Sequence, residues 1–196
     1  MSERLLSHGA AALAWWQGLQ PGEVSGEGKR RPGDSAALAR LRRAGTPAEA
    51  LAEEATLALF TRLGFGSDEG DRRLMRVATV AAVLAHVREH RVMNDRRRNT
   101  AIGMIGRTSL EDADSAILKP LRFKRLLAAR TDEDLMRVMR RLVLLAERKT
   151  NVADLATSIL YWGERVRVRW AFDYYAAGHA APASGQDTSF SSETSQ

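Results

Sequence analysis

Apolar side chains recur at three- and four-residue steps through the C-terminal part of the chain, and this spacing constrains the fold most strongly. One such stripe consists of Leu135, Val138, Leu142 and Leu145. A second follows at Leu155, Ile159, Trp162, Val166 and Trp170. This spacing places the residues of each stripe on one face of a helix. Neither a two-residue alternation nor a fixed internal repeat is visible, so the sequence predicts an all-α fold.

Helix start and stop signals divide the chain into segments. Thr46-Pro47-Ala48-Glu49 combines a capping threonine, a proline at the first helical position and a glutamate at the third. Asp34, Thr131 and Asn151 are further candidate caps. Glycines mark the ends of several segments. The helices expected on this basis cover 3–17, 35–44, 47–63 and 71–91, followed by one that Thr131 opens and a last long one from Asn151 to Gly178.

The segment 92–100 interrupts the pattern, because it contains Asn94-Asp95-Arg96-Arg97-Arg98-Asn99 and almost nothing to bury. It is interpreted as a flexible basic loop and a domain boundary. The prediction is therefore two small helical bundles, an N-terminal helical domain at 1–91 and a C-terminal bundle at 101–177. Residues 178–196 are small, polar and serine-rich, which is typical of a disordered tail.

Composition narrows the protein class. The chain has no cysteine, which excludes disulfides and thiolate metal sites and favours a reducing, cytoplasmic location. No apolar run approaches the ~18 residues that a membrane span needs. The apolar stretch from Gly9 to Trp16 ends in two tryptophans rather than in a small-residue cleavage site, so a signal peptide is not expected.

Positive charge is concentrated in one part of the sequence. Residues 119–149 hold ten basic and four acidic side chains, a net charge of +6, and the whole chain also carries +6. The rest of the chain therefore sums to zero. The excess of arginine over only four lysines also fits a GC-rich genome, but genome composition does not explain why the net charge is local. A concentrated positive charge on helices favours a polyanionic partner such as nucleic acid.

One catalytic motif has to be weighed. His86-Val87-Arg88-Glu89-His90 matches the H-x-x-E-H pattern of some zinc peptidases, and two histidines four residues apart on a helix can bind one metal ion. The match lies at the end of its predicted helix beside a basic loop, and a catalytic zinc needs a third ligand. Solvated polar residues at a helix end are the favoured reading. No phosphate-binding loop or nucleophile motif is found, so we expect neither an enzyme nor a cofactor.

Four tryptophans could stack on nucleic-acid bases, as they do in single-strand binders. They are Trp15, Trp16, Trp162 and Trp170. Each lies on or beside an apolar stripe, so packing in the core is the favoured interpretation.

Several ordered motifs resemble CasB, the small subunit of the type I-E Cascade complex of CRISPR defence. Trp15-Trp16-Gln17-Gly18-Leu19 is similar to the opening W-W-x-x-L of that family, and residues 33–44 resemble its G-D-x-A-x-L-R-R-A signature with two extra residues. Gly106-Arg107 is a weaker match. The C-terminal matches are Arg122-Phe123, Leu126-Leu127, Asp134-Leu135, Arg140-Arg141-Leu142, Trp162-Gly163, and Trp170-Ala171 to Tyr174-Tyr175.

This resemblance implies a non-catalytic subunit that associates as a pair within Cascade. Its expected partners are the other Cascade proteins, the CRISPR RNA-guided complex and target DNA, mainly the displaced strand. Such a subunit would stabilise the R-loop by neutralising phosphates without reading bases. An independent helical regulator that binds a specific DNA sequence is the alternative. The predicted phosphate contacts are Arg42, Arg43, Arg107, Arg122, Lys124, Arg125, Arg130, Arg137, Arg140 and Arg141.

Overall fold

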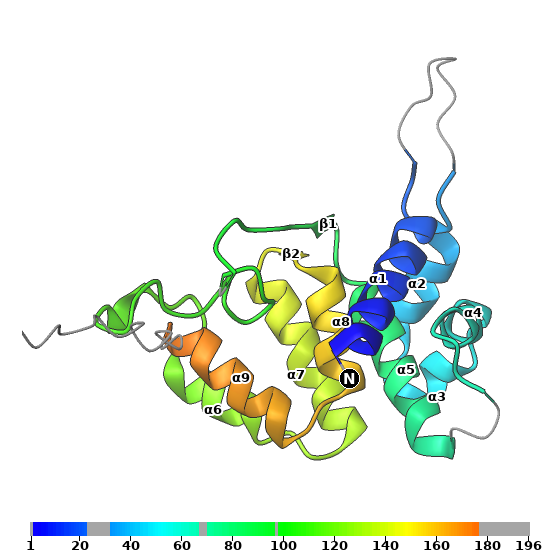
Figure 1. The fold of residues 1–196 in the computed structure, drawn as a ribbon. Helices are drawn as coiled ribbons and strands as arrows, with labels where there is room; N and C mark the ends of the chain where they lie inside the picture. The colour runs from blue at the N-terminus through cyan, green and yellow to red at the C-terminus, as the bar shows by residue number, and fades with distance from the viewer. Residues whose placement is uncertain (1, 23–31, 67–69, 97, 177–196) are drawn as a thin grey trace, which may run out of the picture.

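The computed structural model describes residues 2–22, 32–66, 70–96 and 98–176, and its regular secondary structure is almost entirely helical (Figure 1). The helices of the N-terminal half are α1 (Ser2–Leu19), α2 (Ser35–Arg43), α3 (Pro47–Leu51), α4 (Glu54–Arg62) and α5 (Gly70–Leu84). A 3-10 turn, η1 (Ala113–Ser115), precedes α6 (Pro120–Leu127), α7 (Asp132–Leu145), α8 (Val152–Leu160) and α9 (Glu164–Tyr175). The two short strands are β1 (Glu89–His90) and β2 (Lys149–Thr150). The prediction of an all-α fold is confirmed.

Helices from the two halves of the chain pack directly on each other. The first helix, α1, lies along α8, and α5 contacts both α7 and α8 as well as α3 and α4 (Figure 1). The buried apolar residues form one continuous cluster that includes Trp16 of α1, Leu84 of α5 and Leu155 of α8. The division into domains at 92–100 stays a prediction. None of the described helices is long and apolar enough to cross a membrane.

Four helix starts were predicted correctly, because each of these four depends on a local hydrogen bond. Asp34, Thr46, Thr131 and Asn151 each accept a hydrogen bond from the backbone N–H three residues later. Such side chains satisfy N–H groups that have no partner inside the helix. The four predicted caps are thus confirmed.

The single helix expected over 47–63 is wrong, since the chain breaks it into α3 and α4. Glu53 adopts an extended conformation at the break. The hydroxyl of Thr56 donates to the carbonyl of Ala50 at 2.6 Å. This carbonyl at the end of α3 therefore bonds a side chain instead of the backbone N–H that would continue the helix. Serine and threonine side chains compete for backbone groups in this way.

The expected extension of α5 to Arg91 is also wrong. Helix α5 ends at Leu84, and the following residues run beside the segment after α7. The N–H of Arg88 donates to the carbonyl of Arg148 at 2.8 Å, and the N–H of Arg91 donates to the carbonyl of Thr150 at 2.9 Å. This two-residue parallel ladder between β1 and β2 was not predicted, because neither segment alternates long enough to signal a strand.

The last long helix is interrupted as well. Helix α8 ends at Leu160, and Gly163 takes an extended conformation before α9 begins. The indole N–H of Trp162 donates to the carbonyl of Ala129 at 3.2 Å, which fixes the turn against the end of α6. The predicted tail at 178–196 lies outside the described residues.

The tryptophans belong to the core, which confirms the packing interpretation. Trp15, Trp16 and Trp170 are buried, and Trp162 is half-buried. The indole N–H of Trp15 donates to the carbonyl of Ala55, and that of Trp170 donates to the hydroxyl of Ser158. Buried indole N–H groups usually find such partners, although that of Trp16 has none among the described residues. None of these rings is presented as a flat platform for bases.

Candidate nucleic-acid interface

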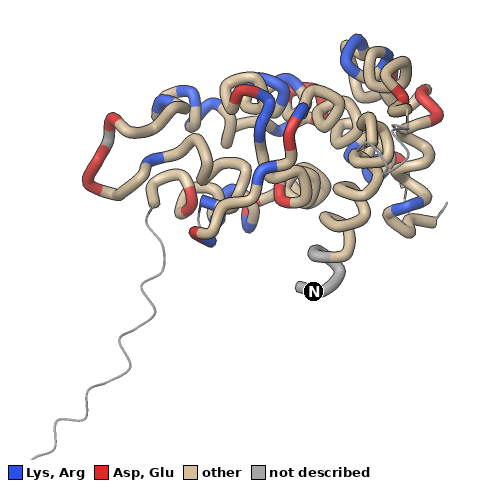
Figure 2. Tube along the Cα trace, turned by 90° about the horizontal axis from the view of Figure 1, so that it is seen from above, with Lys and Arg blue, Asp and Glu red and all other residues tan. Residues whose placement is uncertain are grey.

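Basic positions lie on several helices with acidic positions among them, as Figure 2 shows. The concentration of charge in residues 119–149 therefore does not become one uniformly positive face. A nucleic-acid site has to be sought in the local arrangement of guanidinium groups and their partners.

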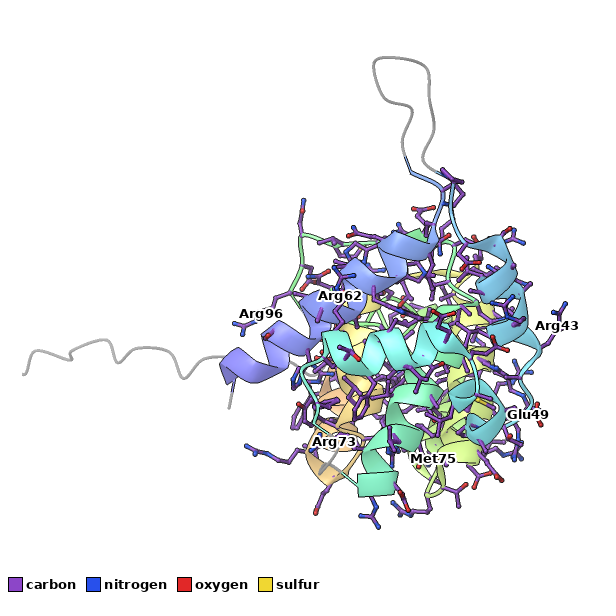
Figure 3. The ribbon with its side chains drawn as sticks, turned by 90° about the vertical axis from the view of Figure 1, so that its right-hand side faces the viewer. Arg43, Glu49, Arg62, Arg73, Met75 and Arg96 are labelled. Carbon is purple, nitrogen blue, oxygen red and sulfur yellow. The ribbon has the colours of Figure 1, made fainter. Side chains whose placement is uncertain are left out.

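The ten predicted contacts differ in what their side chains already bind. Only Arg137 pairs with a carboxylate, that of Asp134 at 3.0 Å, and this exposed pair contributes little. Three others, Arg42, Arg107 and Arg140, donate to backbone carbonyls. The remaining six have no hydrogen bond or ion pair with any described residue, namely Arg43, Arg122, Lys124, Arg125, Arg130 and Arg141. Arg43 projects outward from the end of α2 (Figure 3).

Two of the predicted arginines are anchored at helix C-termini. Nε of Arg42 donates to the carbonyl of Ala85, just after α5, at 2.6 Å. Nη2 of Arg140 donates to the carbonyl of Leu41, in the last turn of α2, at 3.1 Å. Carbonyls at a helix C-terminus lack intrahelical partners and carry partial negative charge, so a guanidinium stabilises them. These contacts tie α2, α5 and α7 together.

Basic side chains from three parts of the fold meet at this junction. Arg42 lies at the end of α2, His86 and Arg88 follow α5, and Arg140 lies on α7. Arg148 follows α7 and has a left-handed backbone, with φ of 64°. We call the set Arg42, Arg88, Arg140 and Arg148, together with His86, the arginine crossing: Arg42, Arg140 and Arg148 act electrostatically on His86, and Arg88 acts on Arg42. Sequence reasoning missed Arg88 and Arg148, because their position depends on the unpredicted pairing of β1 with β2.

The pKa of His86 reports the electrostatic environment of the arginine crossing. Burial, and after it the positive charges of Arg140, Arg148 and Arg42, together lower the pKa of His86 to about 4. Burial also lowers the pKa of Arg42, with Arg148 and Arg88 acting in the same direction. No carboxylate contributes to either shift. The positive potential at His86 and Arg42 is thus not offset by a carboxylate, although the charge of Glu49 acts on Arg140.

Unused hydrogen-bond donors remain at this site. A guanidinium has five N–H donors, and Arg42 and Arg140 each use one on a backbone carbonyl. Nε of Arg140 and Nε2 of His86 are buried without a hydrogen-bond partner among the described residues. Anchored side chains lose little further freedom on binding an anion. The arrangement can therefore bind phosphate oxygens from a pre-ordered position.

A second group of predicted arginines lines a neighbouring hollow of about 430 Å³ between the start of α3 and α7. Arg137, Arg140 and Arg141 all border it, so the structure brings these three predicted residues together. Glu133 borders it as well, and Glu49 raises the pKa of Arg140 against the stronger effect of burial. This hollow is therefore less positive than the arginine crossing.

Other predicted residues lie apart from both sites. Arg107 donates to the carbonyl of Leu110 at 3.3 Å and stands over the ring of Tyr175, with its guanidinium carbon 5.1 Å from the ring centre. Lys124 is exposed on α6, and Arg130 is exposed in the turn between α6 and α7. The structure does not bring these three to the arginine crossing.

The geometry that would make His86 and His90 a zinc pair is absent. Because α5 ends at Leu84, the two histidines do not share a helical face. Nδ1 of His90 accepts from the N–H of Val152 at 3.2 Å. Both rings are half-buried, so the expectation of solvated helix-end residues is also wrong. The described part of the chain contains no group of three or more histidine, aspartate or glutamate side chains that could hold a metal ion.

The described residues thus form a small helical protein in which arginines from three segments act on one half-buried histidine. A family model described as CRISPR-associated protein Cse2 matches residues 37–175, which is more than half of the chain. The chain belongs to this Cse2 family, and the resemblance to CasB is confirmed. No curated protein sequence matches the chain.

A solved structure is also similar in fold. It is a chain from a crystal structure of E. coli Cascade bound to a double-stranded DNA target that contains a PAM. The TM-score is 0.56 at 21% sequence identity, and the alignment covers 87% of this chain and 97% of the other. The likeness extends over nearly the whole of that chain.

Proposed function

We propose that this protein is a non-catalytic subunit of a Cascade complex and grips target DNA, in particular the displaced strand of the R-loop. Membership of the Cse2 family supports the assignment to CRISPR defence, and the fold is shared with a chain of a DNA-bound Cascade. The observation that supports the DNA role is the arginine crossing, where the charges of three arginines act on His86, Arg88 acts on Arg42, and no carboxylate contributes to the shift at either group.

In this proposal the protein contacts the phosphates of the DNA strand rather than its bases. The arginine crossing presents charged donors from three parts of the fold, and none of the tryptophans is available to stack. Guanidinium groups bind phosphate oxygens through charge-assisted hydrogen bonds. A displaced strand has no fixed sequence, so a sequence-independent contact suits it. Arg43 and Arg137 extend this surface along α2 and α7.

Arg88 and Arg148 are the best residues for a test, because their side chains make no hydrogen bond or ion pair within the described residues. Reversing Arg140 would also remove its bond to Leu41 and confuse folding with binding. We expect the double variant Arg88→Gln, Arg148→Gln to bind single-stranded oligothymidine more weakly. The slope of log K against log salt should become shallower by about 0.7 per lost phosphate contact.

Arg62→Gln is the matched control. Arg62 is an exposed arginine of α4 with no side-chain partner among the described residues, and it lies away from α7 (Figure 3). Fluorescence anisotropy across a salt series gives both affinity and slope. If the double variant and Arg62→Gln share the wild-type slope, the arginine crossing does not contact phosphates. The same variants in the assembled complex should show parallel losses of target-DNA retention.

A further inference from the structure

An apolar groove separates α6 from α7. It encloses about 580 Å³, and apart from three arginines its lining is aliphatic. The aliphatic lining consists of Leu118, Leu126, Val138, Leu142, Leu144 and Leu145. Leu144 is 47% exposed, and Leu121, also on α6, is 63% exposed. Leu121 does not line the groove, but Leu144 does, and an apolar groove bordered by an exposed leucine is typical of a docking surface.

The three arginines give the groove a positive rim. Arg122 and Arg125 come from α6, and Arg141 comes from α7. None of their guanidinium groups has a hydrogen bond or ion pair with a described residue. Long arginine stems can lie along apolar surface while the guanidinium stays in water. The rim therefore offers free guanidinium groups directly beside an aliphatic floor.

We propose that this groove binds an amphipathic segment of a protein partner, with apolar side chains on the leucine floor and aspartate or glutamate flanking them. Carboxylates pair with guanidinium groups in a bidentate geometry, and apolar helical faces commonly dock into such grooves. The rim is positive and unpaired, so an acidic flank is the complementary charge. That the partner is a neighbouring subunit of the same complex rests on the proposed function.

Nucleic acid fits the groove poorly. The lining contains no aromatic side chain on which a base could stack. A phosphodiester chain over leucines would lose hydration without gaining a hydrogen bond from them. Arg122 and Arg125, which the sequence predicted to contact phosphates, are assigned here to a protein partner. Arg141 also borders the hollow beside α3, so it lies between that hollow and the apolar groove.

The first test concerns the floor of the groove. The chain is co-expressed with the other subunits of its complex, and its content in the purified complex is measured by quantitative mass spectrometry. Leu144→Asp should lower incorporation at least about tenfold, because one well-buried leucine contributes that much to an interface. Leu57→Asp is the matched control, since Leu57 on α4 is 50% exposed but lies outside the groove.

The second test concerns the rim. The double variant Arg122→Glu, Arg125→Glu should lower incorporation, whereas Arg122→Lys, Arg125→Lys should retain more of it. Circular dichroism melting confirms that each variant folds. If incorporation does not respond to charge reversal, the acidic flank is wrong. If Leu144→Asp is incorporated like Leu57→Asp, the docking proposal is wrong.

Single-strand binding by the isolated chain separates this proposal from the proposed function. Groove variants should keep wild-type affinity for oligothymidine, and Arg88→Gln, Arg148→Gln should lose affinity yet remain incorporated. Weaker DNA binding by the rim variant with normal incorporation would identify nucleic acid as the occupant and overturn the proposal. A wild-type dimer that Leu144→Asp converts to a monomer would identify a second copy instead. If neither the wild type nor any variant binds oligothymidine, only the proposed nucleic-acid role is overturned, and the docking proposal is not affected.

Discussion

Helix α7 contributes to two surfaces that use arginine in different ways. At the arginine crossing, Arg42 and Arg140 are held by backbone carbonyls and surround a half-buried histidine. At the groove between α6 and α7, Arg122 and Arg125 are unpaired and stand beside leucines. The first surface is pre-ordered and polar, which suits phosphate. The second is partly apolar, which suits protein. Net charge alone does not distinguish them, but the neighbours of each guanidinium do.

A substitution at Gly106 should perturb α6, which borders the groove, without changing a residue of the arginine crossing. A Cβ on Gly106 would lie 2.6 Å from the carbonyl oxygen of Tyr174 and 2.8 Å from its Cα. The ring of Tyr174 stacks on Phe123 of α6, with ring centres 3.8 Å apart. Gly106→Ala should therefore displace α9 from α6 and lower the free energy of unfolding by about 1–3 kcal/mol, as overpacking does.

Urea denaturation measures this loss, and Gly18→Ala is the control because no atom lies within 4 Å of a Cβ placed on Gly18. If the two surfaces are independent, Gly106→Ala should also reduce incorporation into the complex and leave the affinity for oligothymidine nearly unchanged. An equal loss of both activities would show that the two surfaces are not independent.

The two adjacent arginines of α2 test whether anchoring matters. Arg42 is bound to the carbonyl of Ala85, whereas Arg43 is exposed and has no partner among the described residues. Arg42→Gln should lower the free energy of unfolding by about 1–2 kcal/mol, because a charge-assisted hydrogen bond at a helix end is lost. Arg43→Gln should stay within about 0.5 kcal/mol of wild type, as exposed substitutions do. Equal effects in urea denaturation would contradict the structural role of Arg42.

The sequence predicted what depends on local chemistry. The caps at Asp34, Thr46, Thr131 and Asn151 were found because each side chain bonds an N–H three residues away. The α-helical class followed from the spacing of apolar residues. The burial of the tryptophans followed from their place on those stripes.

What the sequence did not predict depends on contacts between distant segments. Helix α5 stops at Leu84 because the following residues pair with those after α7 and because Arg42 satisfies the carbonyl of Ala85. Nothing near Ala85 signals this ending. Arg88 and Arg148 therefore could not be assigned to a common site, because they lie 60 positions apart in the sequence. The backbone hydrogen bond of 2.8 Å that joins them is visible only in the fold. The sequence likewise does not distinguish Arg122, which borders the groove, from Arg42, which is bound to a backbone carbonyl.

The smallest expected effect concerns protonation of His86 in the arginine crossing. Burial and three arginines lower the pKa of His86 to about 4 in the folded protein, whereas the unfolded chain has a pKa near ~6.5. Between these values the unfolded chain binds more protons, so stability falls as the pH is lowered from about 6.5 to 4. Because the ring is partly exposed, the loss should be well below about 1.4 kcal/mol per pH unit.

His86→Gln should reduce this dependence, and urea denaturation at a series of pH values measures the difference between the two proteins. Burial also lowers the pKa of His90, which adds a loss of the same sign to both proteins and cancels in the difference. Phosphate bound at the arginine crossing would raise the pKa of His86, so the wild type should take up a proton on binding oligothymidine. Its affinity should therefore rise more steeply than that of His86→Gln as the pH falls toward 4. Identical pH dependence in the two proteins would place the bound phosphates away from His86 and from the arginines that surround it.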